Sequence, residues 1–209
     1  MTIPGYKTVE LDGLHDPLLP AWLDLYETAF PANERLLVSH FIRLLKKKGN
    51  GESANVWLSA LLKDSNPLAG MAVYQIVPKQ SIAYLWYIAI YPKVRNQGLG
   101  SGYYLEIVAN AFELGGKMLF FEVEIPDLAE DEETKSYARR RIAFYQRNGA
   151  ALLTGVHYMQ SVGDHVPCHQ MHLMVHAQGL LTADEAFQRM KELLGNDLQQ
   201  IGPLALVTS

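Results

Sequence analysis

The segment that decides the fold is residues 88–102, which read IAIYPKVRNQGLGSG. An apolar strand runs into a glycine-rich turn, and the apolar spacing that follows predicts a helix from residue 99. Glycines let backbone N–H groups approach a ligand without interference from a Cβ atom. The first turn of a helix also favours anions, because its N–H groups are unpaired and lie at the positive end of the helix dipole. The segment therefore predicts a site for a pyrophosphate group.

Two better-known phosphate loops do not fit this segment. A dinucleotide fingerprint beginning at Gly98 would need Gly or Ala where Tyr103 stands, and no Gly-Lys-Ser/Thr triplet follows. Binding of NAD or ATP is therefore not predicted. A short glycine-rich turn is also often a structural connection only, so its meaning depends on the sequence around it.

Helices and strands alternate on both sides of the turn. Periodicity and turn residues predict strands at 7–11, 55–62, 69–77, 82–90, 118–125, 152–160 and 171–176. They predict helices at 18–30, 33–48, 99–114, 135–147 and 182–195, the last one opened by a capping box at residues 182–185. The predicted fold class is α+β (α/β three-layer), a mixed and mostly antiparallel sheet flanked by helices, with an extra C-terminal helix.

The composition predicts one globular domain spanning residues 1–209. The chain is 49% hydrophobic and 19% charged, and no linker or repeat divides it. Its formal charge of -4 gives no electrostatic reason to expect nucleic acid as a partner. With one cysteine, Cys168, and no signal-like apolar run near the N-terminus, a cytoplasmic location is expected. No stretch has the roughly 20 apolar residues that span a membrane.

Two landmarks in the chain resemble the GNAT superfamily of acyltransferases. Arg95, Gly98 and Gly100 match its phosphate-binding signature, with Ile90 and Pro92 in phase, and residues 141–149 (RIAFYQRNG) resemble the helix end that carries the family's tyrosine. Residues 30–35 (FPANER) and 122–124 (EVE) match a subset of the family. The resemblance covers about residues 7–176 and implies a site for acetyl-CoA. It makes the turn residues the expected cofactor contacts: Arg95, Asn96, Gln97, Gly98, Leu99, Gly100 and Ser101.

The resemblance also implies a distribution of chemical roles. Main-chain N–H groups of the strand at Ile88, Ala89 and Ile90 would hold the thioester oxygen, and Tyr145 would be the general acid. The chain departs from the broader family pattern at Ala138, where many members have an asparagine that contacts the cofactor. It also departs in lacking an acidic residue on the strand 84–90, where some members carry the general base.

Glu122 and Glu124 are the candidates for that base. They lie two residues apart on a predicted strand, so both side chains should leave the same face and share an environment, and two close carboxylates would raise one pKa. An exposed strand face explains the pair equally well. The sequence does not distinguish which of the two would be the base.

Four residues are expected at the acceptor site: Glu34, Arg35, His157 and Tyr158. An ordinary helix start capped by Asn33 explains the first two almost as well. Six His and Cys residues between 157 and 176 lack the spacing of a zinc site, so no metal is predicted, and a loop lining the acceptor cleft is the preferred role. Residues 139–141, three arginines, are expected to pair locally with the acidic residues 131–133.

These features favour an N-acetyltransferase that acylates a primary amine of a small molecule, amino acid or peptide. A longer acyl group remains open, as does a non-catalytic acyl-CoA-binding or regulatory module. The apolar stripe of the last helix leaves open burial against the body of the protein or in a homodimer.

Overall fold

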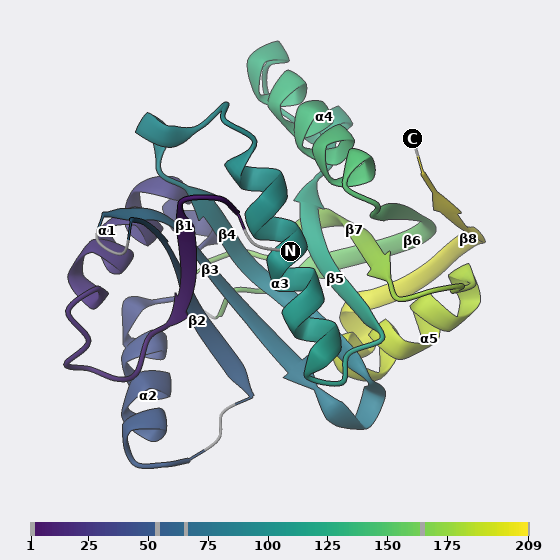
Figure 1. Ribbon diagram of the computed structural model, residues 1–209. Coiled ribbons are helices and arrows are strands. Elements are labelled where there is room, and N and C mark those ends of the chain that lie inside the picture. Colours follow the sequence, from purple (N-terminus) through teal and green to yellow (C-terminus); the bar gives the residue numbers. More distant parts are fainter. Residues whose placement is uncertain (1–2, 53–54, 65–66, 164–165, 209) are drawn as a thin grey trace. The chain divides into compact units, whose positions relative to one another are not determined.

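The computed structural model describes residues 3–52, 55–64, 67–163 and 166–208. Its contacts divide the chain into two compact units. One runs to Ile76 and resumes at Leu85–Asn110, and the other comprises Val77–Tyr84 and the chain from Ala111 onward. The strands are hydrogen-bonded in the order β1-β2-β3-β4-β5-β7-β6-β8 (Figure 1). The predicted α+β class with a mixed, mostly antiparallel sheet is confirmed.

The first unit builds an antiparallel sheet from β1 (Tyr6–Glu10), β2 (Val56–Lys63) and β3 (Leu68–Val77). Helices α1 (Leu19–Ala29) and α2 (Val38–Gly49) pack their apolar faces against its core. Trp22, Tyr26 and Phe41 are fully buried, with ring centroids 4.8–6.0 Å apart. The buried Trp22 indole donates to the Ser59 carbonyl at 2.9 Å, so burying it leaves no unpaired donor.

Strand β4 and helix α3 contribute to both units. Strand β4 (Ile82–Ile90) pairs in parallel with β5 over Ile82–Tyr84, and its remaining residues belong to the first unit. Helix α3 (Leu99–Glu113) begins in the first unit and ends in the second.

The second unit contains β5 (Met118–Glu124), β6 (Ala151–Gln160), β7 (His169–Ala177) and β8 (Leu198–Val207), together with α4 (Glu132–Arg147) and α5 (Ala183–Leu194). Helix α5 buries Phe187 and Met190 in a core formed with strand residues such as Phe120 and Leu173. Its predicted capping box is present, since Thr182 and Glu185 bond each other's backbone N–H groups. Burial against the body of this unit accounts for its apolar stripe.

Two predictions of secondary structure are wrong. The second helix begins at Val38 and not at Asn33, because Ala32–Glu34 form a single 3-10 turn after Pro31 and residues 35 and 37 are extended. Strand β8 was not predicted, because Gly202 and Pro203 interrupt it and its ladder is made only with β6. Among the described residues, no helix is both long and apolar enough to cross a bilayer.

Candidate functional site

The turn before α3 has the backbone shape expected of a phosphate cradle. Asn96 and Gly98 take left-handed conformations, with φ of 63° and 75°. Residues 95–98 are exposed, whereas Leu99 is buried and anchors the start of the helix. A Cβ atom placed on Gly98 would have no heavy atom within 4 Å, so the space over the turn is open. Because the positive φ favours glycine, the turn keeps its main chain accessible to a ligand.

The start of α3 supplies the donors for such a ligand. Gly102 donates to the Gly98 carbonyl at 3.2 Å, which is the first bond of the helical ladder. The N–H groups of Leu99, Gly100 and Ser101 come before this bond, and such groups are the ones a helix leaves for caps, water or anions. Arg95 is partly engaged, because its Nε donates to the Ile90 carbonyl at 2.9 Å and ties the turn to the end of β4. These residues fit a diphosphate.

The strand that leads into the turn alternates in burial. Ala89 is buried, whereas Ile88 and Ile90 are half-buried. Tyr91 N–H donates to the Ala69 carbonyl at 2.8 Å, so the end of β4 is held against β3. The parallel pairing of β4 with β5 joins Ile82–Tyr84 to Met118–Phe120 and extends no further in the described part of the chain.

Glu122 on β5 is half-buried, and hydrogen-bond donors surround its carboxyl. Its Oε1 accepts a hydrogen bond from the hydroxyl of Tyr84 on β4 and another, of 2.7 Å, from the hydroxyl of Tyr158 on β6. Burial raises the pKa of Glu122, and the hydrogen bonds from Tyr84, Tyr158 and Gln160 oppose that rise because they favour the ionised form. Burial and the adjacent Glu122 charge raise the pKa of both phenols, so each stays a donor.

Glu124 has a different environment. It forms an ion pair with Arg141 of α4, and the two side chains are 29% and 49% exposed. The two carboxylates therefore do not share their partners, and the raised pKa of Glu122 comes from burial. The prediction that mutual repulsion would raise one pKa of the pair is wrong. Arg141 was expected to pair with the acidic residues at the start of α4, and that expectation is wrong too.

Tyr145, the predicted general acid, lies one helical turn after Arg141. Its ring is buried against Phe121 and Phe144, at centroid distances of 4.3 and 5.0 Å. Burial raises the pKa of Tyr145 to about 12, with Arg141 lowering it and Glu124 raising it. The phenol is therefore protonated throughout the neutral range, as a proton donor must be.

Two of the four predicted acceptor residues belong to the first unit and two to the second. In the first unit, the Glu34 carbonyl accepts from the Tyr87 hydroxyl at 3.1 Å, and Arg35 Nη1 donates to the Glu27 carbonyl at 2.9 Å. No cap is made by Asn33, which lies inside the 3-10 turn. In the second unit, His157 is half-buried opposite Gln199 of β8, and Tyr158 is buried with its hydroxyl on Glu122.

The histidines show no metal cluster within the described ranges, where no group of three His, Cys, Asp or Glu side chains converges. His165 lies outside the described residues. Cys168 is exposed, while His172 and His176 are half-buried on β7, and burial lowers the pKa of both.

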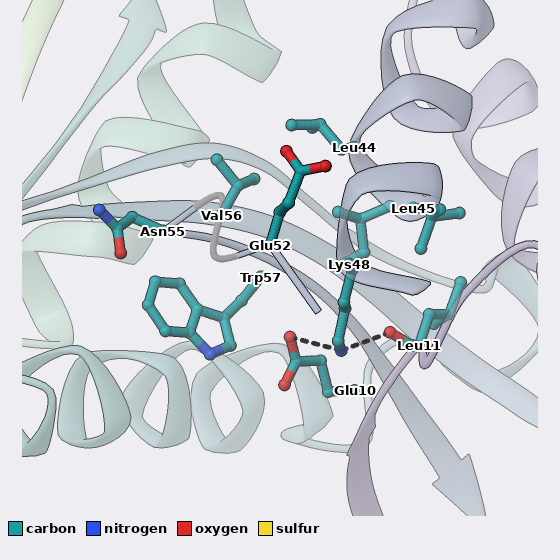
Figure 2. A pocket seen from close by; sticks show the side chains of 10 residues that line it. Glu10, Leu11, Leu44, Leu45, Lys48, Glu52, Asn55, Val56 and Trp57 are labelled. Atoms are coloured by element: carbon teal, nitrogen blue, oxygen red, sulfur yellow. Dashed lines mark hydrogen bonds and ion pairs between the residues drawn. The ribbon is translucent and has the colours of Figure 1, made fainter. Parts of the chain in front are cut away.

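A pocket lies in the first unit, beside the end of α2 (Figure 2). Figure 2 shows Lys48 pointing to its edge, where Nζ contacts the Glu10 carboxylate at 2.8 Å and the Leu11 carbonyl at 2.6 Å. The walls are mainly aliphatic, with Trp57 on one side, and none of the turn residues before α3 lines this pocket.

A mixed sheet and an open glycine turn at a helix start are the features that the resemblance to acyltransferases predicted. Residues 19–150 match the model of the acetyltransferase (GNAT) family. The match covers more than half of the chain, so the protein belongs to this family. It is an acyltransferase that carries out acetyl transfer with acetyl-CoA as co-substrate, as the resemblance implied.

Solved structures agree with the family assignment at the level of the fold. A protein assigned to the GNAT acetyltransferases from Bacteroides thetaiotaomicron is 23% identical, with a TM-score of 0.66, over 90% of this chain and 94% of that one. A Bacillus subtilis acetyltransferase in complex with CoA is 14% identical, with a TM-score of 0.55, over 84% and 99%. The ribosomal-protein-S18-alanine N-acetyltransferase of Escherichia coli is 18% identical, with a TM-score of 0.52, over 84% and 96%. No curated protein sequence matches the chain significantly.

Sequence reasoning missed the partners of the central carboxyl. Tyr84 and Gln160 were not candidates, and Tyr158 was expected at the acceptor site and not beside Glu122. These residues come from two strands, β4 and β6, and they lie 36 to 38 positions from Glu122 in the chain. No local pattern could have grouped them, because a pairing of strands far apart in the chain leaves no mark on either strand alone.

Proposed function

We propose that the protein transfers the acetyl group to a primary amine of a small molecule, an amino acid or a peptide, by direct attack in a ternary complex. The observation that carries the proposal is the open left-handed turn at Gly98 in front of α3. Acetyl-CoA supplies an activated acyl thioester. The main chain of residues 96–101 would hold its diphosphate, and the N–H groups of Ile88–Ile90 would bind the thioester oxygen.

Of the two glutamates, Glu122 is the better candidate for the general base. A base must take a proton from an ammonium group, and burial gives Glu122 the higher proton affinity that this needs. Glu124 is instead held in an ion pair with Arg141. Tyr145 would deliver the proton to the departing thiolate, since its phenol keeps that proton at working pH.

The nature of the acceptor is supported only by similarity of fold. Proteins of the same fold include the S18-alanine N-acetyltransferase already mentioned and a spermidine N-acetyltransferase of Vibrio cholerae, 12% identical with a TM-score of 0.60. Their names indicate a protein amine and a polyamine. The latter is dodecameric. For this chain we propose a single catalytic domain, a cytoplasmic location in keeping with its one cysteine, and a homodimer as the assembly to test by light scattering.

Release of free CoA from acetyl-CoA over a panel of primary amines tests the proposal. Tyr145→Phe and Glu122→Gln should each lower turnover by about 10²-fold or more while CoA affinity, measured by calorimetry, is retained. Tyr137→Phe is the matched control, because Tyr137 lies on the same helix and is 56% exposed. Binding of acetyl-CoA without turnover of any amine would favour a non-catalytic binding module, and absence of CoA binding would remove the basis of the assignment.

A further inference from the structure

Strand β6 departs from regular pairing next to Glu122. Leu153 pairs with Leu173 of β7 and Met159 pairs with Gln170, so five residues of β6 (154–158) lie opposite two of β7 (171–172). On the other edge, Thr154 pairs with Ala205 of β8 and Val156 with Gln200. One residue of β6 therefore lies opposite four of β8. Such bulges bend a strand and redirect its side chains, and they are enriched next to active sites.

Gly155 is the residue that this bend requires. Its φ is +79°, and a Cβ atom there would lie 2.7 Å from the carbonyl carbon of Pro203, and closer still to its oxygen. The backbones of β6 and β8 thus meet at a point where no side chain fits. Glycine satisfies both demands, because it has no Cβ and adopts positive φ without strain.

The bend brings Tyr158 to a carboxyl that regular pairing would not let it reach. In the sheet order, β7 lies between β5 and β6, and yet the Tyr158 hydroxyl donates to Glu122 Oε1 at 2.7 Å. From the opposite side, Tyr84 donates to the same oxygen, and its ring is stacked on Phe120 with centroids 4.5 Å apart and planes 7° apart. The hydroxyl groups of Tyr84 on β4 and Tyr158 on β6 therefore both donate to the same carboxyl oxygen of Glu122 on β5.

We propose that the β6 bulge is a positioning device, in which Tyr158 and Tyr84 together hold the Glu122 carboxylate in one orientation and in its ionised form. The inference rests on the proposed function, because it explains how a half-buried carboxyl is kept ready to accept a proton. Both phenols donate to the same atom, and an atom that accepts two hydrogen bonds is best satisfied when it carries negative charge. Tyr158 and Tyr84 act through Glu122 and are positioning residues.

The other groups around the carboxyl are consistent with this assignment. On β6, Gln160 adds a hydrogen bond that also favours the ionised form. On β7, the residue opposite Glu122 in the register is the apolar Leu173. Asp197, which follows α5, acts on the Tyr158 phenol and makes its ionisation harder. The neighbours of Glu122 named above are hydrogen-bond donors and an apolar residue. None of them is a cation that would keep the carboxylate ionised without the phenols.

Titration of Glu122 by NMR, with ¹³C-labelled glutamate carboxyls and Glu122→Gln for assignment, tests the device directly. Tyr158→Phe and Tyr84→Phe each remove one donor to the anion, so each should raise the Glu122 titration midpoint by about one pH unit. Tyr137→Phe should leave it unchanged. If Tyr158→Phe fails to fold, Tyr84→Phe gives the same readout. An unchanged midpoint in both variants, or one that falls, overturns the proposal.

Kinetics then separate this inference from the proposed function. With an amine that is turned over, the acidic limb of the kcat/KM profile should move to higher pH by the same amount in Tyr158→Phe, and the KM for acetyl-CoA should not change. A shifted NMR midpoint in a protein that acetylates no amine supports the device and overturns the proposed function. Turnover with shifted kinetics but an unshifted midpoint overturns the device alone.

Discussion

The contrast between two glycines gives a sharp test of the structure. Gly155 and Gly98 both have positive φ, at 79° and 75°, but a Cβ atom at Gly98 would meet nothing within 4 Å. Alanine at either position incurs backbone strain of about 1 kcal/mol. At Gly155 the new Cβ also lies 2.7 Å from the Pro203 carbonyl carbon, so the strands must shift, at a further cost of about 1–3 kcal/mol.

Gly155→Ala should therefore lower the free energy of unfolding by about 2–4 kcal/mol, against about 1 kcal/mol for Gly98→Ala. For a chain of this length, that corresponds to a fall in Tm of about 10 °C against about 3 °C. Urea unfolding followed by circular dichroism, with thermal scans under one buffer condition, measures both. Equal destabilisation by the two variants would refute the close approach of β6 and β8. Conversely, Gly98→Ala should weaken CoA binding and Gly155→Ala should not do so at temperatures where it stays folded.

Three further predictions concern single side chains. Because the pKa of Tyr145 is raised to about 12, pH–rate profiles of wild type should show no loss of activity from its ionisation between about pH 8 and 10, and a limb that disappears in Tyr145→Phe would contradict this. Burial lowers the pKa values of His172 and His176, so the unfolded chain binds more protons and stability should be lost as pH falls through about 6.5. Urea midpoints should show this loss, and it should be smaller in His176→Gln. Asp131 caps α4 by accepting from Thr134 N–H at 2.7 Å, so Asp131→Ala should cost about 1 kcal/mol in the same assay, with exposed Glu130→Ala as control.

Local patterns were sufficient where one element decides its own structure. The apolar strand, glycine turn and helix of residues 88–102 have the predicted bounds, since β4 ends at Ile90 and α3 begins at Leu99. The capping box at Thr182 is likewise a contact between residues three apart. Such features depend on neighbouring residues in the chain, so a single sequence contains the information that specifies them.

Predictions failed where distant segments compete for the same groups. The second helix was expected from Asn33, but Glu34 and Leu36 are instead bonded to the Tyr87 hydroxyl of β4, which holds this segment extended or in a short turn. Arg141 was expected to pair within its own helix, and Glu124 of β5 takes it instead. In both cases a partner from another element outweighs the weak local preference, and that partner cannot be located from spacing.

By itself, the sequence determined the fold class, the order of most elements and the backbone shape of the glycine-rich turn before α3, because each of these follows from local periodicity and from glycines that permit positive φ. Only the tertiary structure decided which glutamate accepts hydrogen bonds from two phenols and which is paired with an arginine. Alternation along β5 places Glu122 and Glu124 on the same face of the strand, so the sequence pattern does not distinguish them. They differ in their partners. Glu122 accepts hydrogen bonds from Tyr84 of β4 and Tyr158 of the bent β6, while Glu124 is paired with Arg141 of α4.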